Sequence, residues 1–174
     1  MIPRLKKIYQ EEISQNLIKS LSIKNAMEVP KLEKIVLNMG LGLDASDSKI
    51  LKSIQTDLGN LTGQLPIVTK SKKAVANFKT REGVPLGLKV TLRKNNMYFF
   101  LDRLITMALP RIKDFRGLNP DSFDQEANYS FGIKEHVIFP EVSFDKIEKM
   151  RGLDITVVTS TKNQEASRAL LDSF

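Results

Sequence analysis

The stretch that decides the fold is LGLKVTLRK, residues 86–94, in which apolar and polar side chains alternate. In an extended chain the two kinds fall on opposite sides: Leu88, Val90 and Leu92 on one, and Lys89, Thr91 and Arg93 on the other. Successive side chains of a β-strand point to opposite faces of a sheet. The alternation therefore predicts a strand with one buried face and one open face.

Other stretches on both sides of this one also read as strands. LEKIVLNMG (32–40) also alternates: Leu32, Ile35, Leu37 and Met39 belong mostly to one face, and Lys34, Val36 and Asn38 to the other. Shorter strands are predicted over 65–70, 128–135 and 136–139, and a clear one over 153–161.

Apolar residues at helical spacing predict helices between these strands. They are expected over 4–21, from residue 50 to Gly63, over 97–109, over 164–174 and, more briefly, over 144–150. The expected end signals are Asp44, Ser46 or Asp47 as the cap of the second helix, a turn at 94–96, Pro110 as a stop and Asn163 as the last cap. Several strand pairs lack a helical crossover, which favours an α+β class. We expect a mainly antiparallel sheet with helices packed on one face and a long basic loop, in a single domain of residues 1–174.

Composition excludes several classes of protein. The 174 residues are 41% hydrophobic and 27% charged, which is typical of a globular chain. No apolar run approaches the roughly 20 residues that cross a bilayer, and the N-terminus lacks a secretory pattern, so no membrane partner is expected. There is no cysteine, and no carboxylate–histidine cluster has metal-ligand spacing, so we expect no metal and no cofactor.

Positive charge is concentrated in the middle of the chain. Residues 66–116 hold twelve Lys and Arg against three acids, although the whole chain has a net charge of only +7. Such a concentration is typical of a surface that binds a polyanion, and a merely solvated basic surface is the alternative.

A basic loop, residues 72–85, lies between two predicted strands in this region. The stretch KSKKAVANFKTREGVPLG (70–87) carries five cations and one acid. Lysine and arginine neutralise phosphates, and an exposed Phe78 among them can stack on a base or a ribose. The alternative is that Phe78 packs beneath the loop as a local plug.

Two other features suggest enzymatic chemistry, but each is a weaker signal than the basic loop is for nucleic-acid binding. GLGLDA (40–45) fits a dinucleotide-binding turn between a strand and a helix, with Gly40 and Gly42 near a pyrophosphate. Asp44 would repel that ligand inside the turn, and the next strand ends in Lys70 where a ribose-binding acid is needed. His136 is the only histidine, expected at a strand edge, and nothing in the sequence pairs with it as a general base.

Five long blocks in order carry a resemblance that runs from about residue 29 to residue 171. They are EVPKLEKIVLNMGLG, GQLPIVTKSKKAVANFKTREGVPLGLKVTLR, RLITMALPRIKDFRGL, NYSFGIKEHVIFPE and RGLDITVVTST. Together they resemble the bacterial-type ribosomal protein family that binds 5S rRNA in the central protuberance of the large subunit, universal large-subunit protein five.

The resemblance implies a site for each partner. The 5S rRNA would contact the open sheet face, through Lys34, Asn38, Gln64, Lys70, Lys89, Thr91 and Arg93. P-site tRNA would contact the basic loop, through Lys72, Lys73, Phe78 and Arg81. A small-subunit head protein would bind on or near the loop over 113–127.

The predicted function is therefore a non-enzymatic structural constituent of the large subunit. It would attach 5S rRNA to large-subunit rRNA, contact P-site tRNA and bridge to the small-subunit head, with no small-molecule substrate. The expected location is the cytoplasmic ribosome, with an organellar ribosome left open. A nucleotide-dependent enzyme using Gly40 and Gly42, and a basic adaptor for an acidic protein, are the two alternatives.

Overall fold

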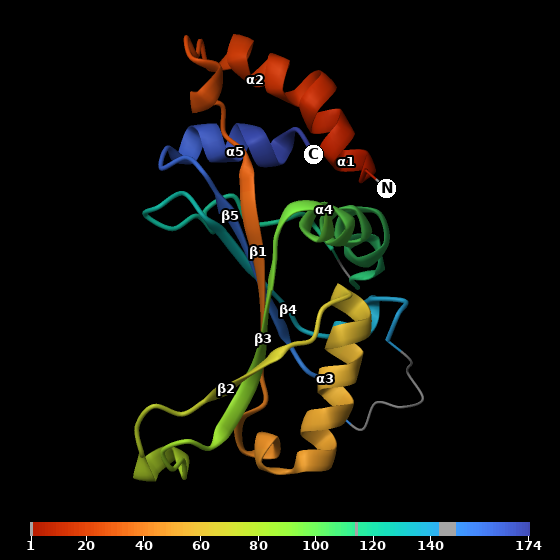
Figure 1. The fold of residues 1–174 in the computed structure, drawn as a ribbon, viewed down its shortest axis with the longest axis vertical. Helices are drawn as coiled ribbons and strands as arrows, with labels where there is room; N and C mark the ends of the chain where they lie inside the picture. Colours follow the sequence, from red (N-terminus) through yellow and green to blue (C-terminus); the bar gives the residue numbers. More distant parts are fainter. Residues whose placement is uncertain (1, 114, 143–148) are drawn as a thin grey trace. The chain divides into compact units, whose positions relative to one another are not determined.

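The fold is built on one five-stranded sheet (Figure 1). The computed structural model describes residues 2–113, 115–142 and 149–174. The strands are β1 (Leu32–Gly40), β2 (Ile67–Lys70), β3 (Pro85–Leu92), β4 (Tyr129–Ile133) and β5 (Leu153–Thr159), in the order β2-β3-β1-β5-β4. The sheet is antiparallel, which confirms the α+β prediction.

The helices follow the predicted order along the chain. They are α1 (Arg4–Ile8), α2 (Ser14–Ser20), α3 (Ser48–Thr62), α4 (Lys94–Arg103) and α5 (Gln164–Asp172). A π-helical turn, Tyr9–Ile13, joins α1 to α2, and a second, Leu104–Ala108, extends α4 toward the short 3-10 turn Leu109–Arg111. Two further 3-10 turns, Ala26–Glu28 and Gly42–Ser46, flank β1.

The ends of α3 and α5 are set by the residues that the sequence indicated. The Asp47 side chain accepts a hydrogen bond from the backbone N–H of Lys49 at 2.8 Å, and Asn163 does the same for Glu165 at 2.9 Å. Gly63 ends α3 in the left-handed conformation, with φ +66°. Of the three cap candidates for α3, Asp47 is therefore the cap.

Three expectations need comment. Residues 94–96 are not a turn: they form the first turn of α4, where unpaired N–H groups meet water and polar side chains are tolerated. Residues 136–139 are not a strand, because His136–Ile138 forms a 3-10 turn. The short helix expected over 144–150 falls mostly outside the described residues.

Two compact units divide the chain. Unit 1 contains Met1–Ile35, Leu92–Phe131 and Thr156–Phe174, and unit 2 contains Val36–Thr91 and Gly132–Ile155. The expectation of a single 5S rRNA-binding domain over 1–174 stays a prediction.

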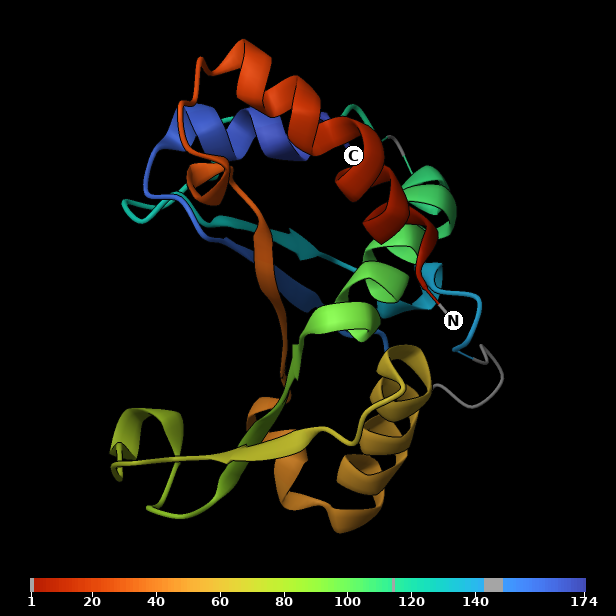
Figure 2. The same cartoon turned by 45° about the horizontal axis from the view of Figure 1, so that its top comes forward.

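Unit 1 packs its helices against the buried side of β4 and β5. Leu101 and Leu104 of the α4 region and Leu171 of α5 line an apolar cavity together with Phe131 and Val157. The last residue, Phe174, stacks on Tyr9 with ring centroids 6.2 Å apart, so α5 lies beside the N-terminal helix in both views (Figures 1 and 2). Tyr98, tilted against Phe174, has its pKa raised to about 12 by burial and, second, by Tyr9.

Unit 2 covers one side of its strands with α3. Ile54, Leu58 and Leu61 of this helix are buried and surround Met39 of β1. Figure 2 shows α3 along one side of β2 and β3, with the β2–β3 loop projecting from their ends. The opposite side of the strands, which we call the open face, carries no helix of this unit in the described part of the chain.

Candidate nucleic-acid interface

The open face of unit 2 is polar along β1 and β3. Asn38 and Lys89 are exposed and Thr91 is half-buried, whereas their neighbours Leu37, Leu88 and Val90 are buried on the other side. The alternation that predicted the strands therefore also placed these three side chains correctly. Amide, hydroxyl and ammonium groups offer hydrogen-bond donors to phosphate and ribose oxygens.

A glycine lets the strands of this face approach closely. Gly87 lies in β3, opposite Thr69 of β2. A Cβ at Gly87 would lie 2.6 Å from the carbonyl oxygen of Met39 and 3.2 Å from Oγ1 of Thr69. No side chain larger than hydrogen fits without a shift of the backbone, so the close approach of β1 and β3 requires glycine at this point.

Two of the predicted contact residues belong to unit 1. Lys34 of β1 is half-buried, and Arg93, which directly follows β3, is exposed. On β4 and β5, Ser130 and Thr156 pair through their hydroxyls at 3.0 Å. This part of the unit therefore also presents polar side chains rather than apolar ones.

Lys70 is the last residue of the short edge strand β2, and Gln64 lies three residues before its start; both are exposed. The Gln64 backbone is held by Thr62, whose hydroxyl donates to the Gln64 carbonyl at 2.9 Å. At Lys70 the pairing with β3 shifts by a bulge, after Thr69. The backbone at Gln64 and at Lys70 is thus fixed by hydrogen bonds or strand pairing, while both side chains remain exposed.

The basic loop forms a small hairpin with a 3-10 turn, Ala76–Phe78, at its tip. Val75 and Thr80 exchange backbone hydrogen bonds of 3.1 and 3.2 Å, and Ser71 and Val84 close the base at 2.8 Å. Phe78 is 72% exposed, so it does not plug the loop from beneath. The predicted contacts of this loop are all exposed: Lys72, Lys73, Phe78 and Arg81.

The GLGLDA stretch holds unit 2 together instead of presenting a free phosphate turn. Gly42–Ser46 is a 3-10 turn, and the Asp44 carboxylate accepts from Lys149 Nζ at 3.0 Å and from an Arg151 guanidinium nitrogen at 2.9 Å. These bonds, that of Lys149 first, lower the pKa of Asp44. The buried His136 is also structural, because its Nδ1 lies 3.1 Å from the carbonyl oxygen and 3.3 Å from the backbone nitrogen of Arg151.

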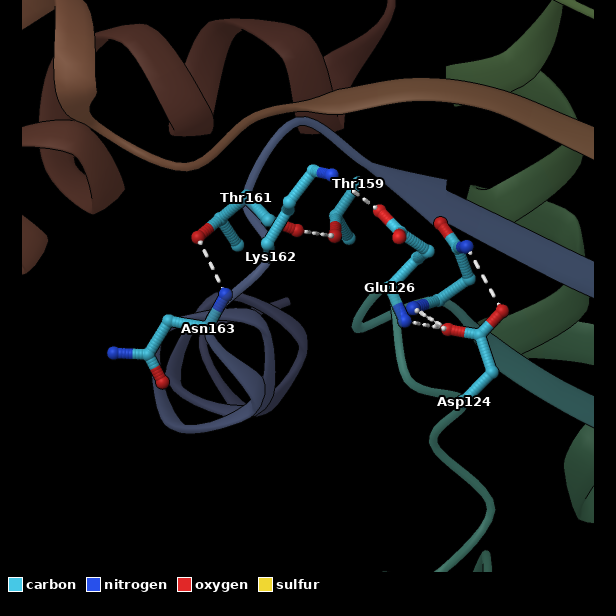
Figure 3. A network of polar contacts seen from close by, with 7 residues as sticks. Asp124, Glu126, Thr159, Thr161, Lys162 and Asn163 are labelled. Carbon is cyan, nitrogen blue, oxygen red and sulfur yellow. Dashed lines mark hydrogen bonds and ion pairs between the residues drawn. The ribbon is translucent and has the colours of Figure 1, made fainter.

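A polar network fastens the end of the loop over 113–127 (Figure 3). Asp124 accepts from the Asn128 side chain and from the backbone N–H groups of Asn128 and Glu126, and these bonds, that of the Asn128 side chain first, lower the pKa of Asp124. Glu126 pairs with Lys162 at 3.0 Å, beyond the end of β5. The predicted bridge loop is therefore tied to the β5–α5 turn.

Sequence reasoning missed residues on the open face of unit 2. Ile67 lies opposite Lys89 in the β2–β3 register and is 71% exposed, and Leu65 just before β2 is 75% exposed. Asp154 of β5 is exposed, and its Oδ2 accepts from Nδ2 of Asn38 at 3.4 Å. The alternation of β5 already signalled Asp154, since Leu153 and Ile155 are the apolar neighbours that a buried side requires.

No described helix meets the length and apolarity that a bilayer crossing requires. Nor do the residues with a described position contain a group of three or more His, Cys, Asp or Glu side chains able to hold a metal ion.

Comparison with known proteins covers almost the whole chain. The family model of ribosomal protein L5 matches residues 25–81, and the model of the ribosomal L5P family C-terminus matches residues 85–174. The chain is 63% identical over 174 residues to large ribosomal subunit protein uL5 of Pelagibacter ubique (strain HTCC1062), covering 100% of this chain and 95% of that protein. It is 54% identical to the protein of that name from Dichelobacter nodosus (strain VCS1703A), over 98% of this chain and 96% of the relative. A third, from Clostridium botulinum (strain Loch Maree / Type A3), is 56% identical over 98% of this chain and 95% of the relative.

Proposed function

Because the chain belongs to the L5 family of ribosomal proteins, and is thus a structural constituent of the large subunit in the cytoplasmic ribosome, we propose that its open face anchors 5S rRNA. In this proposal the protein attaches 5S rRNA to large-subunit rRNA in the central protuberance. It acts as a binding protein rather than an enzyme, through one 5S rRNA-binding domain of residues 1–174.

The observation that carries this proposal is the open face of unit 2. Asn38, Lys89 and Thr91 point away from α3, on strands whose other side is buried. A-form RNA presents 2′-hydroxyls and base edges in a wide, shallow minor groove, which short polar side chains on a sheet face can reach. Gln64, Lys70, Lys34 and Arg93 complete the proposed contacts, the cations toward phosphates.

A filter-binding titration of 5S rRNA tests this assignment. Asn38→Ala and Thr91→Ala should each weaken binding by about 1–3 kcal/mol, because each leaves a hydrogen-bonding group of the complex without its partner. Thr56→Ala is the matched control for Thr91: its hydroxyl lies on α3, where it donates to the Lys52 carbonyl at 2.9 Å. If both open-face variants bound 5S rRNA as tightly as the control, the RNA would lie elsewhere.

The basic loop is proposed to contact P-site tRNA. Lys72, Lys73 and Arg81 offer cations for phosphates, and the exposed Phe78 offers a ring for stacking. Deleting residues 72–82 should spare 5S rRNA binding and weaken tRNA binding in reconstituted ribosomes. Loss of 5S rRNA binding on this deletion would contradict the division of the two sites.

The bridge to a small-subunit head protein is proposed on the loop over 113–127. Its support is the network of Asp124, Glu126 and Lys162, which fixes the end of a loop whose residues 115–121 are exposed. Glu126→Ala together with Lys162→Ala should lower the association of the two subunits. Unchanged association would place the bridge on another surface.

A nucleotide-dependent enzyme is the alternative that a simple titration separates. In the structure Asp44 is engaged by Lys149 and Arg151 in the turn where a pyrophosphate would bind. We therefore expect neither NAD nor ATP to produce binding heat or a thermal shift. Heat or a shift that Gly42→Ala abolishes would favour the enzyme instead.

A further inference from the structure

One acid stands on the open face of unit 2, among groups suited to RNA. Asp154 lies in β5, which is the neighbour of β1 on one side and of β4 on the other. Its Oδ2 faces β1, where it accepts from Asn38 Nδ2 at 3.4 Å. Its Oδ1 faces β4, where a Cβ on Gly132 would lie 3.4 Å away. Because residue 132 is a glycine, it places no side chain beside that oxygen, and Asp154 is exposed.

This carboxylate has no cation as a partner within the described residues. The ion pairs found there join other acids, and Asp154 makes only the hydrogen bond with Asn38. A carboxylate accepts hydrogen bonds and donates none, so it holds the Asn38 amide with its NH₂ toward β5 and its carbonyl oxygen free. Asn38 is thereby set to accept a hydrogen bond as well as to donate its second amide proton.

The two side chains therefore select for a particular chemistry in their ligand. A phosphate is negatively charged and only accepts, so an uncompensated carboxylate beside it repels it. A ribose 2′-hydroxyl or a guanine amine can donate to a carboxylate, and both are displayed in the minor groove of A-form RNA. The pair Asn38–Asp154 thus suits neutral donor groups of RNA and disfavours backbone phosphates.

We propose that Asp154 is a specificity-determining residue of the RNA site, which accepts a hydrogen bond from a neutral donor of the RNA and keeps phosphates away from the centre of the open face. The proposal rests on the function proposed above. In this proposal the surrounding cations provide most of the affinity for RNA, and Asp154 discriminates between 5S rRNA and other RNAs.

The test measures binding of full-length protein to 5S rRNA and to a control duplex RNA of similar length at one salt concentration. For Asp154→Ala, binding to 5S rRNA should weaken about tenfold, as for a lost hydrogen bond to a charged group. Binding to the control RNA should strengthen by roughly fourfold, since a charge about 5 Å from a phosphate is removed in water. Asp57→Asn removes an acid from α3 in the same unit and serves as the control for net charge.

Two more variants show whether the effect of Asp154→Ala on RNA binding comes from the lost carboxylate or from a folding defect. Asp154→Asn is close in shape to the wild type and should also tighten binding of the control RNA without tightening that of 5S rRNA. Gly132→Val keeps the charge but covers Oδ1, so it should weaken 5S rRNA binding and leave the control RNA unaffected. Equal gains for both RNAs with Asp154→Asn, or full 5S rRNA affinity with Asp154→Ala and Gly132→Val, would overturn the proposal.

Chemically substituted 5S rRNA identifies the RNA group that donates the hydrogen bond to Asp154. One set of 5S rRNA carries sparse 2′-deoxy substitutions, which remove ribose hydroxyls, and another carries inosine, which lacks the guanine amine. Only one of the two kinds of substitution should weaken binding of the wild type without weakening that of Asp154→Ala, and that kind identifies the donor. If no position behaved in this way, Asp154 would have no such partner. A wild-type protein that did not prefer 5S rRNA at all would overturn the proposed function itself.

Discussion

Replacement of Gly87 by alanine should destabilise the protein, although alanine normally suits a strand better than glycine. Gly87 is in β3, and the added Cβ would lie 2.6 Å from the Met39 carbonyl oxygen, 3.2 Å from Thr69 Oγ1 and 3.5 Å from the Gly40 Cα. The nearest atom belongs to the backbone of β1, so it cannot rotate away. The strands must separate or slide to admit the methyl group.

Two opposing terms set the size of the effect. Overpacking that forces a backbone shift costs about 1–3 kcal/mol. Loss of glycine's extra freedom in the unfolded chain returns about 0.5–1 kcal/mol. Because the 2.6 Å contact is to backbone, we place the clash in the upper part of its range, which leaves a net loss of about 1–2 kcal/mol in the free energy of unfolding.

Urea unfolding followed by circular dichroism measures this difference. With a slope of about 2 kcal/mol per molar urea, the midpoint should fall by roughly 0.5–1 M. Gly132→Ala is the matched control on the same sheet, because its Cβ would meet only the Asp154 carboxylate at 3.4 Å, and its midpoint should hold or rise. A Gly87→Ala midpoint equal to or above the wild type would refute the close approach of β1 and β3.

Three further substitutions test α3 and the turn before it in unit 2. Asp47→Ala removes the cap of α3 and should cost about 1 kcal/mol in urea unfolding, whereas a change near zero would mean that the cap is not formed in solution. Leu58→Ala removes a buried side chain of the same helix and should cost about 2–5 kcal/mol; a loss below 1 kcal/mol would contradict its packing. The bonds from Lys149 and Arg151 lower the folded pKa of Asp44, so their stabilisation is present above the unfolded value of 3.8 and lost as pH falls through the folded pKa. Asp44→Asn should therefore lower the thermal midpoint at pH 7 and much less at strongly acid pH, and an equal loss at both would exclude the ion pair as the cause.

The regular elements were predictable where one periodicity ran long enough. Strand β1 has the predicted bounds, and α3 lies between a capping acid and a glycine that the sequence marked in advance. The strand predicted over 136–139 was wrong because three apolar residues after a histidine, Val137 to Phe139, are too few to show a period. There His136 is buried against the backbone of Arg151, a contact fifteen residues away that tertiary structure alone provides.

Half of the candidate site followed from alternation within single strands. Lys89 and Thr91 could be placed on the open side because Leu88, Val90 and Leu92 had to be inside. Contacts between strands could not be placed in this way, since they depend on which strands are neighbours. Asp154 lies 116 residues from Asn38 in the chain, and only the order β1-β5-β4 brings the two together.

The edge of the sheet supports the view that the open face is covered in the assembled particle. Strand β2 is an edge strand, and exposed apolar edges tend to pair with other chains. Its four residues, the bulge at Lys70 and the charge of that lysine limit such pairing in the free protein. The same edge nevertheless exposes Leu65 and Ile67, with Ile67 beside Lys89. An apolar side chain next to a cation suits a nucleotide: the ribose or base packs on the apolar side chain, and the phosphate pairs with the cation. The apolar surfaces are then removed from water in the same contact that neutralises the phosphate. Isoleucine also suits a strand exposed to water, so it is the position of Ile67 beside Lys89, rather than the residue type alone, that favours an RNA reaching the edge of the sheet.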